Sequence, residues 1–236
     1  RLHSKGATAY REQNNVPMII VHPEFSGGKR CAAVTTHLDI APTLIGMTGI
    51  SDKRKSEITK GLPGKDFSPM LAAPEMAGVD SARDGALFCY NMFAYIDGDF
   101  MDKAVALMLQ PDGKEKVMAA VKRGELKPNL GKRGAIRGVF DGRYQYSRYF
   151  SPRQHNMPTT LEAIFRLNDV ELFDLQSDPL ELNNLALSPE KYGELLLHMN
   201  EKLNRLIESE VGDDIGQMLP DRIDGGWVAT DAVGDV

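Results

Sequence analysis

The stretch IRGVFDGRYQYSRYF, residues 136–150, determines how the second half of this chain folds. Two runs rich in β-branched and aromatic side chains, residues 136–140 and 144–150, flank Asp141-Gly142, which is a strong signal for a tight hairpin turn. In the second run two sets of side chains alternate, which predicts a strand with one exposed face: Tyr144, Tyr146 and Arg148 against Gln145, Ser147 and Tyr149. We therefore expect an antiparallel hairpin here.

Other segments on both sides of this hairpin carry strand and helix patterns. Residues 86–90 and 170–175 are short apolar runs typical of strands. Residues 101–109 and 114–123 have helical spacing and are separated by the turn residues of Pro111-Asp112-Gly113. These elements predict an α+β unit built on an antiparallel sheet.

A long helix is predicted near the end of the chain. Ser188 is a suitable N-cap, Pro189 fits the first helical position, and Gly212 would end the helix. Seven apolar side chains fall on one stripe at helical spacing: Tyr192, Leu195, Leu196, Met199, Leu203, Leu206 and Ile207. Because such a stripe needs burial, we expect this helix to pack on the sheet.

The first quarter of the chain has a different pattern. Val16-Pro17 precedes residues 18–21, MIIV, a continuous apolar run bounded by prolines that predicts a strand buried on both faces. A helix follows, for which Asp39 is the expected N-cap and Gly49 the expected C-cap. Strand, loop and helix in this order indicate an α/β layer. Residues 51–84, rich in Lys, Pro, Gly and Ala, are interpreted as a connector to the second unit.

Composition narrows the classes of partner. The formal net charge is -5 and no dense block of Lys and Arg is present, which argues against nucleic acid as a partner. No stretch approaches the roughly 18 apolar residues of a membrane span. Cys31 and Cys89 both adjoin apolar residues and lack the spacing of a zinc site, so we expect reduced and partly buried thiols. The chain opens at Arg1 without Met, which suggests a cut end.

Three stretches, in this order and at this spacing, resemble the sulfatase family. Residues 5–17, KGATAYREQNNVP, are similar to the family's K-G-x-x-Y-E-x-x-x-R-V-P. Residues 37–44, HLDIAPTL, are similar to H-x-D-L-x-P-T-L. Residues 171–186, ELFDLQSDPLELNNLA, are similar to E-L-Y-D-L-x-x-D-P-x-E-x-x-N-L-A. The first stretch departs from the family pattern by one extra residue before Tyr10 and by Arg11, where an acidic residue is usual.

The resemblance implies a fold in two parts. Residues 1–75 would close an α/β domain with the mixed sheet of sulfatases and alkaline phosphatases. Residues 76–236 would form the smaller C-terminal α+β subdomain, with its antiparallel sheet and long helix. The chain is then the C-terminal portion of a larger enzyme, and the N-terminal part of the same protein is its expected partner.

The resemblance also implies a reaction. Sulfatases hydrolyse sulfate esters of small molecules or carbohydrates with a formylglycine nucleophile and a Ca²⁺ or Mg²⁺ ion. The formylglycine arises from a Cys or Ser in C-x-P-S-R, and neither Cys31 nor Cys89 lies in such a sequence. The family's metal ligands would precede Arg1, so no metal ligand is assigned in this chain. We therefore expect the isolated chain to be inactive.

Lys5 is the residue of this chain to which the resemblance assigns a catalytic role. In the family, the lysine at this position contacts the sulfate and the leaving-group oxygen. A fixed ammonium there stabilises the negative charge that grows as the S–O bond breaks. His3, two residues earlier, and His155, in the loop after the hairpin, are candidate substrate-binding residues.

Two alternatives remain open from the sequence. A phosphodiesterase or a phosphonate monoester hydrolase of the same superfamily would share this scaffold, and this portion of the chain does not separate them from a sulfatase. A non-catalytic binding or structural module is the alternative from a different class. The upstream sequence would decide between them, because a C-x-P-S-R motif would dismiss the non-catalytic reading.

Overall fold

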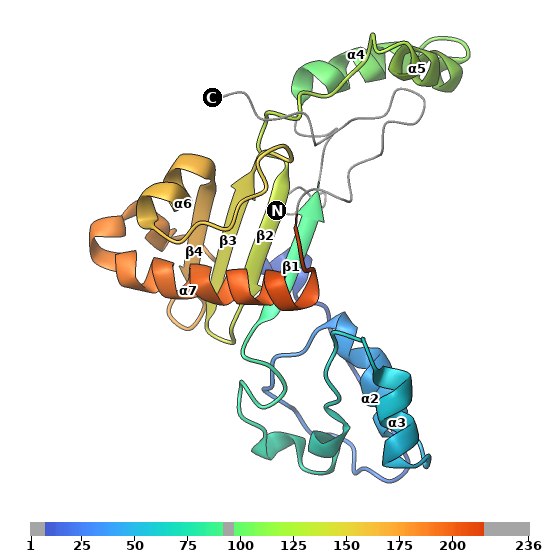
Figure 1. Ribbon diagram of the computed structural model, residues 1–236, viewed down its shortest axis with the longest axis vertical. Coiled ribbons are helices and arrows are strands. Elements are labelled where there is room, and N and C mark those ends of the chain that lie inside the picture. The colour runs from blue at the N-terminus through green and yellow to red at the C-terminus, as the bar shows by residue number, and fades with distance from the viewer. Residues whose placement is uncertain (1–7, 92–96, 215–236) are drawn as a thin grey trace.

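The computed structural model describes residues 8–91 and 97–214, and its centre is a four-stranded sheet covered on both faces (Figure 1). The strand order is β1-β2-β3-β4, and every neighbouring pair is antiparallel. Strands that lie side by side in the order of the chain form a meander, in which each connection joins two neighbouring strands. The predicted antiparallel sheet is confirmed.

The predicted hairpin is formed by β2, Ala135–Phe140, and β3, Tyr144–Phe150. The backbone N–H of Asp141 donates to the carbonyl of Tyr144, so the two central turn residues are Gly142 and Arg143. Gly142 has φ +97°, the left-handed region that the first central position of a type II′ turn requires. The turn is therefore centred one residue later than the Asp141-Gly142 dipeptide suggested.

The outer strands and the long helix complete the main core. β1, Ala86–Asn91, pairs with β2, and β4, Asp169–Asp174, pairs with β3. Helix α7, Pro189–Glu210, lies across one face of the sheet (Figure 1). Its predicted stripe supplies fully buried side chains, each worth roughly 1.5–3 kcal/mol to folding: Leu196, Met199 and Leu203. Ser188 stands at the predicted N-cap position, although its side chain accepts no capping hydrogen bond.

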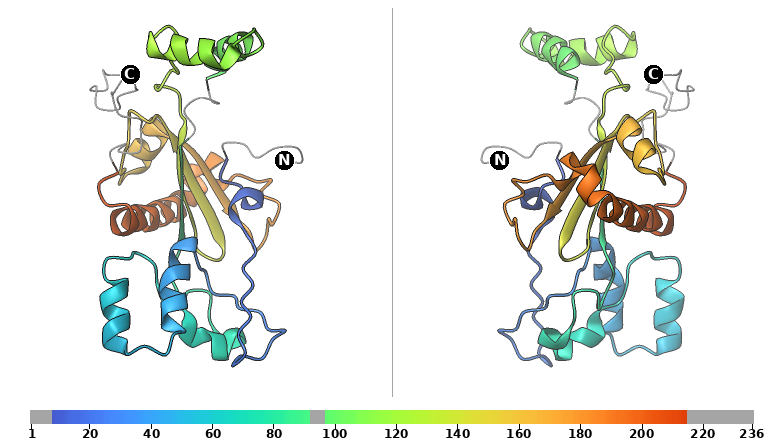
Figure 2. Two further views of the ribbon diagram at one scale, coloured as in Figure 1. Left: turned by 90° about the vertical axis from the view of Figure 1, so that its right-hand side faces the viewer. Right: turned by 90° about the vertical axis from the view of Figure 1, so that its left-hand side faces the viewer.

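The expectation of a half-exposed β3 is wrong. Both of its faces are buried, with Tyr146 and Arg148 beneath α7 and Gln145 and Ser147 on the opposite side. The views along the sheet edge show the reason, because α7 lies on one side and the short helix of residues 11–14 lies on the other (Figure 2). Helix α6, Leu161–Leu167, which the sequence analysis did not identify, packs beside α7 through Ile164.

A helical hairpin projects from one end of the sheet (Figure 1). It consists of α4, Gly98–Met108, and α5, Gly113–Lys122, close to the two predicted segments. The two helices share a small core of Phe100, Ala120 and Leu126, separate from the main core. Asp112 before α5 adopts φ +56°, an uncommon left-handed conformation for a residue other than glycine.

The first quarter of the chain differs from its prediction in three ways. Residues 16–21 form no strand and are exposed, Ile19 by 87% and Val21 by 90%. A strand needs a hydrogen-bonding neighbour, and none of the described residues pairs with this run. The helix after it is α2, Ile40–Gly46, which ends before Gly49, with Met47 as its C-cap. Asp39 does not cap it through its side chain, since that carboxylate is used elsewhere.

The expected connector, residues 51–84, contains regular structure. Helix α3, Asp52–Thr59, has Ser51 as its N-cap, and the Ser51 hydroxyl accepts from the backbone N–H of Arg54. Short 3-10 turns follow at Ser68–Ala72 and Pro74–Met76. The sequence pattern hid α3 because the helix buries no residue and so shows no apolar stripe. A further short helix, α1, covers Arg11–Asn14. Other 3-10 turns lie at His37–Asp39 and Leu185–Leu187.

The two cysteines are both free, as expected, but Cys31 is exposed rather than partly buried. Cys89 on β1 is half-buried, and burial raises the pKa of its thiol to about 11. No helix among the described residues is long and apolar enough to cross a membrane.

Candidate functional site

Residues 9–11 are attached to the face of the sheet opposite α7 and to the loop after β4. The backbone N–H of Ala9 donates to the hydroxyl of Tyr149 on β3 at 2.9 Å. That hydroxyl in turn donates to Glu171 Oε2 on β4 at 2.5 Å. The ring of Tyr10 lies 5.9 Å from the ring of Phe173, also on β4. Two consecutive residues, Ala9 and Tyr10, thus connect the N-terminal segment to two neighbouring strands.

A second attachment involves a buried acid in the loop after β4. Glu181 is 3% exposed, and its Oε2 accepts from the backbone N–H of Arg11 at 2.9 Å. Its backbone is left-handed, with φ +53°. The side-chain amide of Asn14 donates to the backbone carbonyl of Ala9 at 2.8 Å, a contact within the same segment. Residues 8–14 are therefore held by contacts from residues 149–181.

Two of the three predicted site residues, Lys5 and His3, lie outside the described residues. The third, His155, lies in the loop after β3, and its side chain is only 7% exposed. Its Nδ1 lies 3.0 Å from Asp214 Oδ1, and its ring meets Phe150 edge-on at 5.1 Å. His155 is thus buried in a polar cluster.

Arg137 on β2 is the centre of that cluster. Its guanidinium donates twice to Asp214, at 2.7 and 2.8 Å, and once to the side-chain oxygen of Asn91 at 3.1 Å. Burial alone would raise the pKa of Asp214, but His155 and Arg137 outweigh it and hold that pKa well below its ordinary value. The sequence signal for this cluster was the charged side chain of Arg137 in the middle of a predicted strand, for which no role was predicted.

A second buried cluster joins the first quarter of the chain to α7. Arg83 is 2% exposed and donates to both oxygens of Asp39, at 3.0 and 2.5 Å, and to Glu210 Oε1 at 2.5 Å. Asp39 also accepts from the backbone N–H groups of Thr36 and Lys65, each at 2.8 Å. This explains why Asp39 is not a side-chain cap of α2, because all of its acceptor capacity serves these partners.

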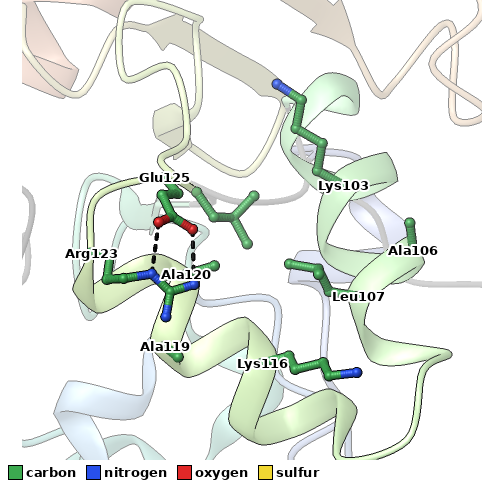
Figure 3. Close-up of a pocket in the computed structure, with 9 residues that line it drawn as sticks. Lys103, Ala106, Leu107, Lys116, Ala119, Ala120, Arg123 and Glu125 are labelled. Atoms are coloured by element: carbon green, nitrogen blue, oxygen red, sulfur yellow. Dashed lines mark hydrogen bonds and ion pairs between the residues drawn. The ribbon is translucent and has the colours of Figure 1, made fainter.

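A cavity of about 530 Å³ lies between α4 and α5 (Figure 3). Its wall is largely apolar and comes from Ala106, Leu107, Ala119, Ala120 and Leu126. Arg123 and Glu125 at its edge are bound to each other at 2.7 and 2.9 Å. Lys103 and Lys116 extend away from one another (Figure 3). No set of polar side chains converges in this cavity, so it lacks the groups that orient and select a ligand.

The described residues also offer no place for the expected cation. Among them, no group of three or more His, Cys, Asp or Glu side chains could hold a metal ion. Hard divalent cations need several converging oxygen ligands, so we derive no step through a metal from these residues.

Comparison with known proteins gives one match among curated proteins and several among solved structures. No protein-family model matches the chain. The ulvan-active sulfatase of Formosa agariphila is 34% identical over a match that covers 34% of this chain and 17% of that protein. The chain therefore spans less than a fifth of the length of this relative.

Two solved structures show weaker likeness. One is a protein described in connection with the metabolism of multiple glycosaminoglycans by Bacteroides thetaiotaomicron. Its TM-score is 0.43 and its sequence identity 22%, and the match covers 74% of this chain and 27% of that chain. The other was solved with its substrate D-glucosamine-2-N,6-O-disulfate, with a TM-score of 0.41, 14% identity, and coverage of 76% and 25%. TM-scores this low do not establish a common fold.

Proposed function

Because this chain belongs to the sulfatase family, we propose that the protein of which it forms part hydrolyses sulfate esters. The observation that carries this proposal is the 34% identity to a sulfatase, together with the three motifs in their family order. The structure adds support, because it brings the first and third motifs into contact, through Ala9, Tyr10 and Arg11 on one side and Glu171, Phe173 and Glu181 on the other.

We propose a sulfated carbohydrate as the class of substrate. The relative from Formosa agariphila is described as active on ulvan. A carbohydrate sulfate carries a charged group on a polar ring, so its recognition needs cationic and hydrogen-bonding side chains rather than a dry apolar cavity. The cavity between α4 and α5 has a largely apolar wall, and we do not place the substrate there.

The two units predicted from the sequence form part of the same proposal. Residues 1–75 would complete an α/β catalytic domain, and residues 76–236 would form its C-terminal subdomain. The exposed apolar side chains of residues 16–21 support this division, because an unpaired run of this kind is stabilised by burial against neighbouring strands. The formylglycine nucleophile and the ligands of a Ca²⁺ or Mg²⁺ ion would come from the rest of the parent protein.

Lys5 is proposed as the catalytic residue that this chain supplies. Its ammonium would face the bridging oxygen of the sulfate ester, where negative charge develops as the S–O bond breaks. A donor that meets charge only in the transition state raises kcat more than it changes substrate binding. His3 and His155 remain predicted substrate-binding residues. The burial of His155 beside Asp214 means that any contact with substrate would require that cluster to open.

The test is Lys5→Ala in the full-length parent enzyme, assayed on sulfated oligosaccharides and on an aryl sulfate. We expect kcat to fall by about 10²–10³-fold, the usual cost of removing one such group. Lys60→Ala is the matched control, since Lys60 is exposed in a turn, and it should leave kcat unchanged.

The melting temperature of each variant is measured beside the kinetics, since a misfolded protein would imitate a catalytic defect. An unchanged kcat/KM in a normally folded Lys5→Ala enzyme would remove Lys5 from the mechanism. Hydrolysis of phosphate diesters or phosphonate monoesters by the wild-type enzyme, without turnover of sulfate esters, would overturn the proposed reaction.

A further inference from the structure

We propose that Tyr149, Glu171 and Glu181 are positioning residues, which act on the reaction through the segment that carries Lys5. This inference rests on the proposed function. The three side chains belong to β3, β4 and the loop after β4, far from Lys5 in the sequence. Their contacts with Ala9 and Arg11 span 140 and 170 residues of chain.

The attachment to Ala9 is a relay of two hydrogen bonds. Tyr149 accepts from the amide of Ala9 and donates to Glu171, so one hydroxyl is used in both directions. Burial, followed by the nearby Glu171 carboxylate, raises the pKa of Tyr149, so the hydroxyl keeps the proton that the second bond needs. Ala9 itself is 2% exposed, so water cannot easily replace Tyr149 as the partner of its amide.

The contact between Glu181 and Arg11 requires two features of Glu181 that are unfavourable in free energy. Glu181 is buried, and burying a carboxylate is unfavourable unless hydrogen bonds compensate. Its left-handed backbone is also one that L side chains rarely adopt. Features of this kind persist where the surrounding fold requires them, and they cluster at functional sites. Here the contact that they make possible is the bond from Glu181 to the amide of Arg11.

The consequence for Lys5 is geometric. Lys5 precedes Ala9 by four residues, and an extended chain spans at most about 3.6 Å per residue. A tether of four residues is therefore short, at most roughly 14 Å when fully extended. An ammonium that must meet one oxygen atom benefits from a short tether with a fixed end, because small displacements of a catalytic group cost rate. The C-terminal sheet supplies that fixed end.

The experiment is a double-mutant cycle in the full-length parent enzyme, with Tyr149→Phe and Lys5→Ala. Tyr149→Phe removes one oxygen atom and both bonds of the relay but keeps the ring. Tyr144→Phe is the matched control, because it makes the same change on the same strand and Tyr144 has no hydrogen bond to residues 8–14 among those of the described residues. Glu181→Met is the second variant, which keeps the length of the side chain and removes both of its acceptor oxygens.

We expect Tyr149→Phe to lower kcat by about tenfold or more with less than a twofold change in KM. In the Lys5→Ala background the same substitution should have little further effect, because both changes remove one contribution. Hydrogen exchange at the backbone amides of Ala9 and Arg11 should accelerate in Tyr149→Phe and in Glu181→Met, respectively, with the rest of the sheet still protected. Tyr144→Phe should match the wild type in every measurement.

Each contrary outcome has its own meaning. Additive effects of Tyr149→Phe and Lys5→Ala would overturn the positioning role, as would unchanged exchange at Ala9 and Arg11. A loss of activity explained entirely by a lower melting temperature would show that Tyr149 is only structural and would overturn it too. Wild-type enzyme without sulfate ester turnover would instead refute the proposed function, while the exchange measurements would still test the attachment of residues 8–14.

Discussion

Two arginines of this chain are equally buried and differently partnered. Arg83 is 2% exposed and Arg148 is 0% exposed. Arg83 binds the carboxylates of Asp39 and Glu210. Arg148 donates to the amide oxygen of Asn200 at 2.9 Å, while its Nε and Nη2 atoms have no hydrogen-bond partner. Among the ion pairs of the described residues, none includes Arg148.

The difference appears in their acidity. Burial lowers the pKa of Arg83, but the hydrogen bonds and charges of Asp39 and Glu210 outweigh this effect and raise it above its ordinary value. Burial lowers the pKa of Arg148 to about 10, since no carboxylate compensates for it directly. Both guanidiniums remain charged at neutral pH. The comparison teaches that burial sets the cost of a charge, whereas its partners decide whether the fold recovers that cost.

The locations of the two residues explain their roles. Arg83 connects Asp39, in the first quarter of the chain, to Glu210 at the end of α7. Arg148 lies on β3 beneath α7, where Tyr146 also donates to Asn200 and Asn200 donates to the carbonyl of Pro158. The first residue holds two parts of the molecule together. The second belongs to a hydrogen-bond network in which two donor groups, Nε and Nη2 of Arg148, have no partner.

The largest effect is expected from Arg83→Met, which leaves Asp39 and Glu210 buried without their cation. We expect the free energy of unfolding to fall by about 3–5 kcal/mol, the usual cost of breaking a buried pair from one side. Urea denaturation measures it, with Arg205→Met as the control because the pair of Arg205 with Asp84 is exposed. A loss below about 1 kcal/mol would mean that the carboxylates find other partners and would end the contrast with Arg148.

A smaller effect is expected from Arg148→Met. Replacing a buried and poorly paired charge by an apolar side chain of similar length is often neutral or stabilising. Tyr146 would still donate to Asn200, so no acceptor is stranded. We expect unfolding free energy to change by less than about 1 kcal/mol or to rise. A loss above about 3 kcal/mol would show that Arg148 is as well compensated as Arg83.

The smallest effect concerns an ion pair closer to the surface, between Asp97 and Lys132 at 2.7 Å. The hydrogen bond from Lys132, followed by those from the amides of Asn129 and Phe100, lowers the pKa of Asp97 from 3.8 to about 2. A lowered folded-state pKa stabilises the fold above the unfolded value, and this stabilisation is lost as pH falls. We expect Asp97→Asn to flatten the decline of stability between pH 3.8 and about 2.

Asp99→Asn is the control for that measurement, because the side chain of Asp99 is 89% exposed and lies 3.7 Å from the same ammonium. Acid titration of the unfolding midpoint, followed by circular dichroism, compares the two variants with the wild type. An unchanged slope in Asp97→Asn would show that this pair, unlike the buried pair of Arg83, contributes nothing measurable to stability.

Local patterns in the sequence were sufficient to predict the four strands, the helical hairpin and the long helix of the second unit, but not helix α6. The strands at Ala86–Asn91, Ala135–Phe140 and Tyr144–Phe150 lie within one residue of their predicted ends. The reason is that alternation, turn residues and an apolar stripe are properties of neighbouring residues, and each element here follows its own propensity. Helix α3 was missed because it buries nothing, so its sequence contains no apolar stripe.

The candidate site was less predictable. Ala9 and Arg11 belong to the first motif and Glu181 to the third, whereas Tyr149 lies outside all three motifs. The sequence contained no indication that Ala9 meets Tyr149 or that Arg11 meets Glu181. Contacts across so many residues depend on how the sheet, the loop after β4 and the N-terminal segment pack together. Period-based patterns do not encode such packing.

The sequence by itself determined the four strands of the antiparallel sheet, the apolar stripe of α7 and the resemblance to sulfatases. Only the tertiary structure decided what the charged residues do. Asp39, predicted as a helix cap, became the partner of Arg83, and the predicted half-exposed strand became buried on both faces. The physical reason is that hydrophobic periodicity reports which side of an element is covered, whereas the partner of a buried charge depends on residues brought close only when the chain is folded.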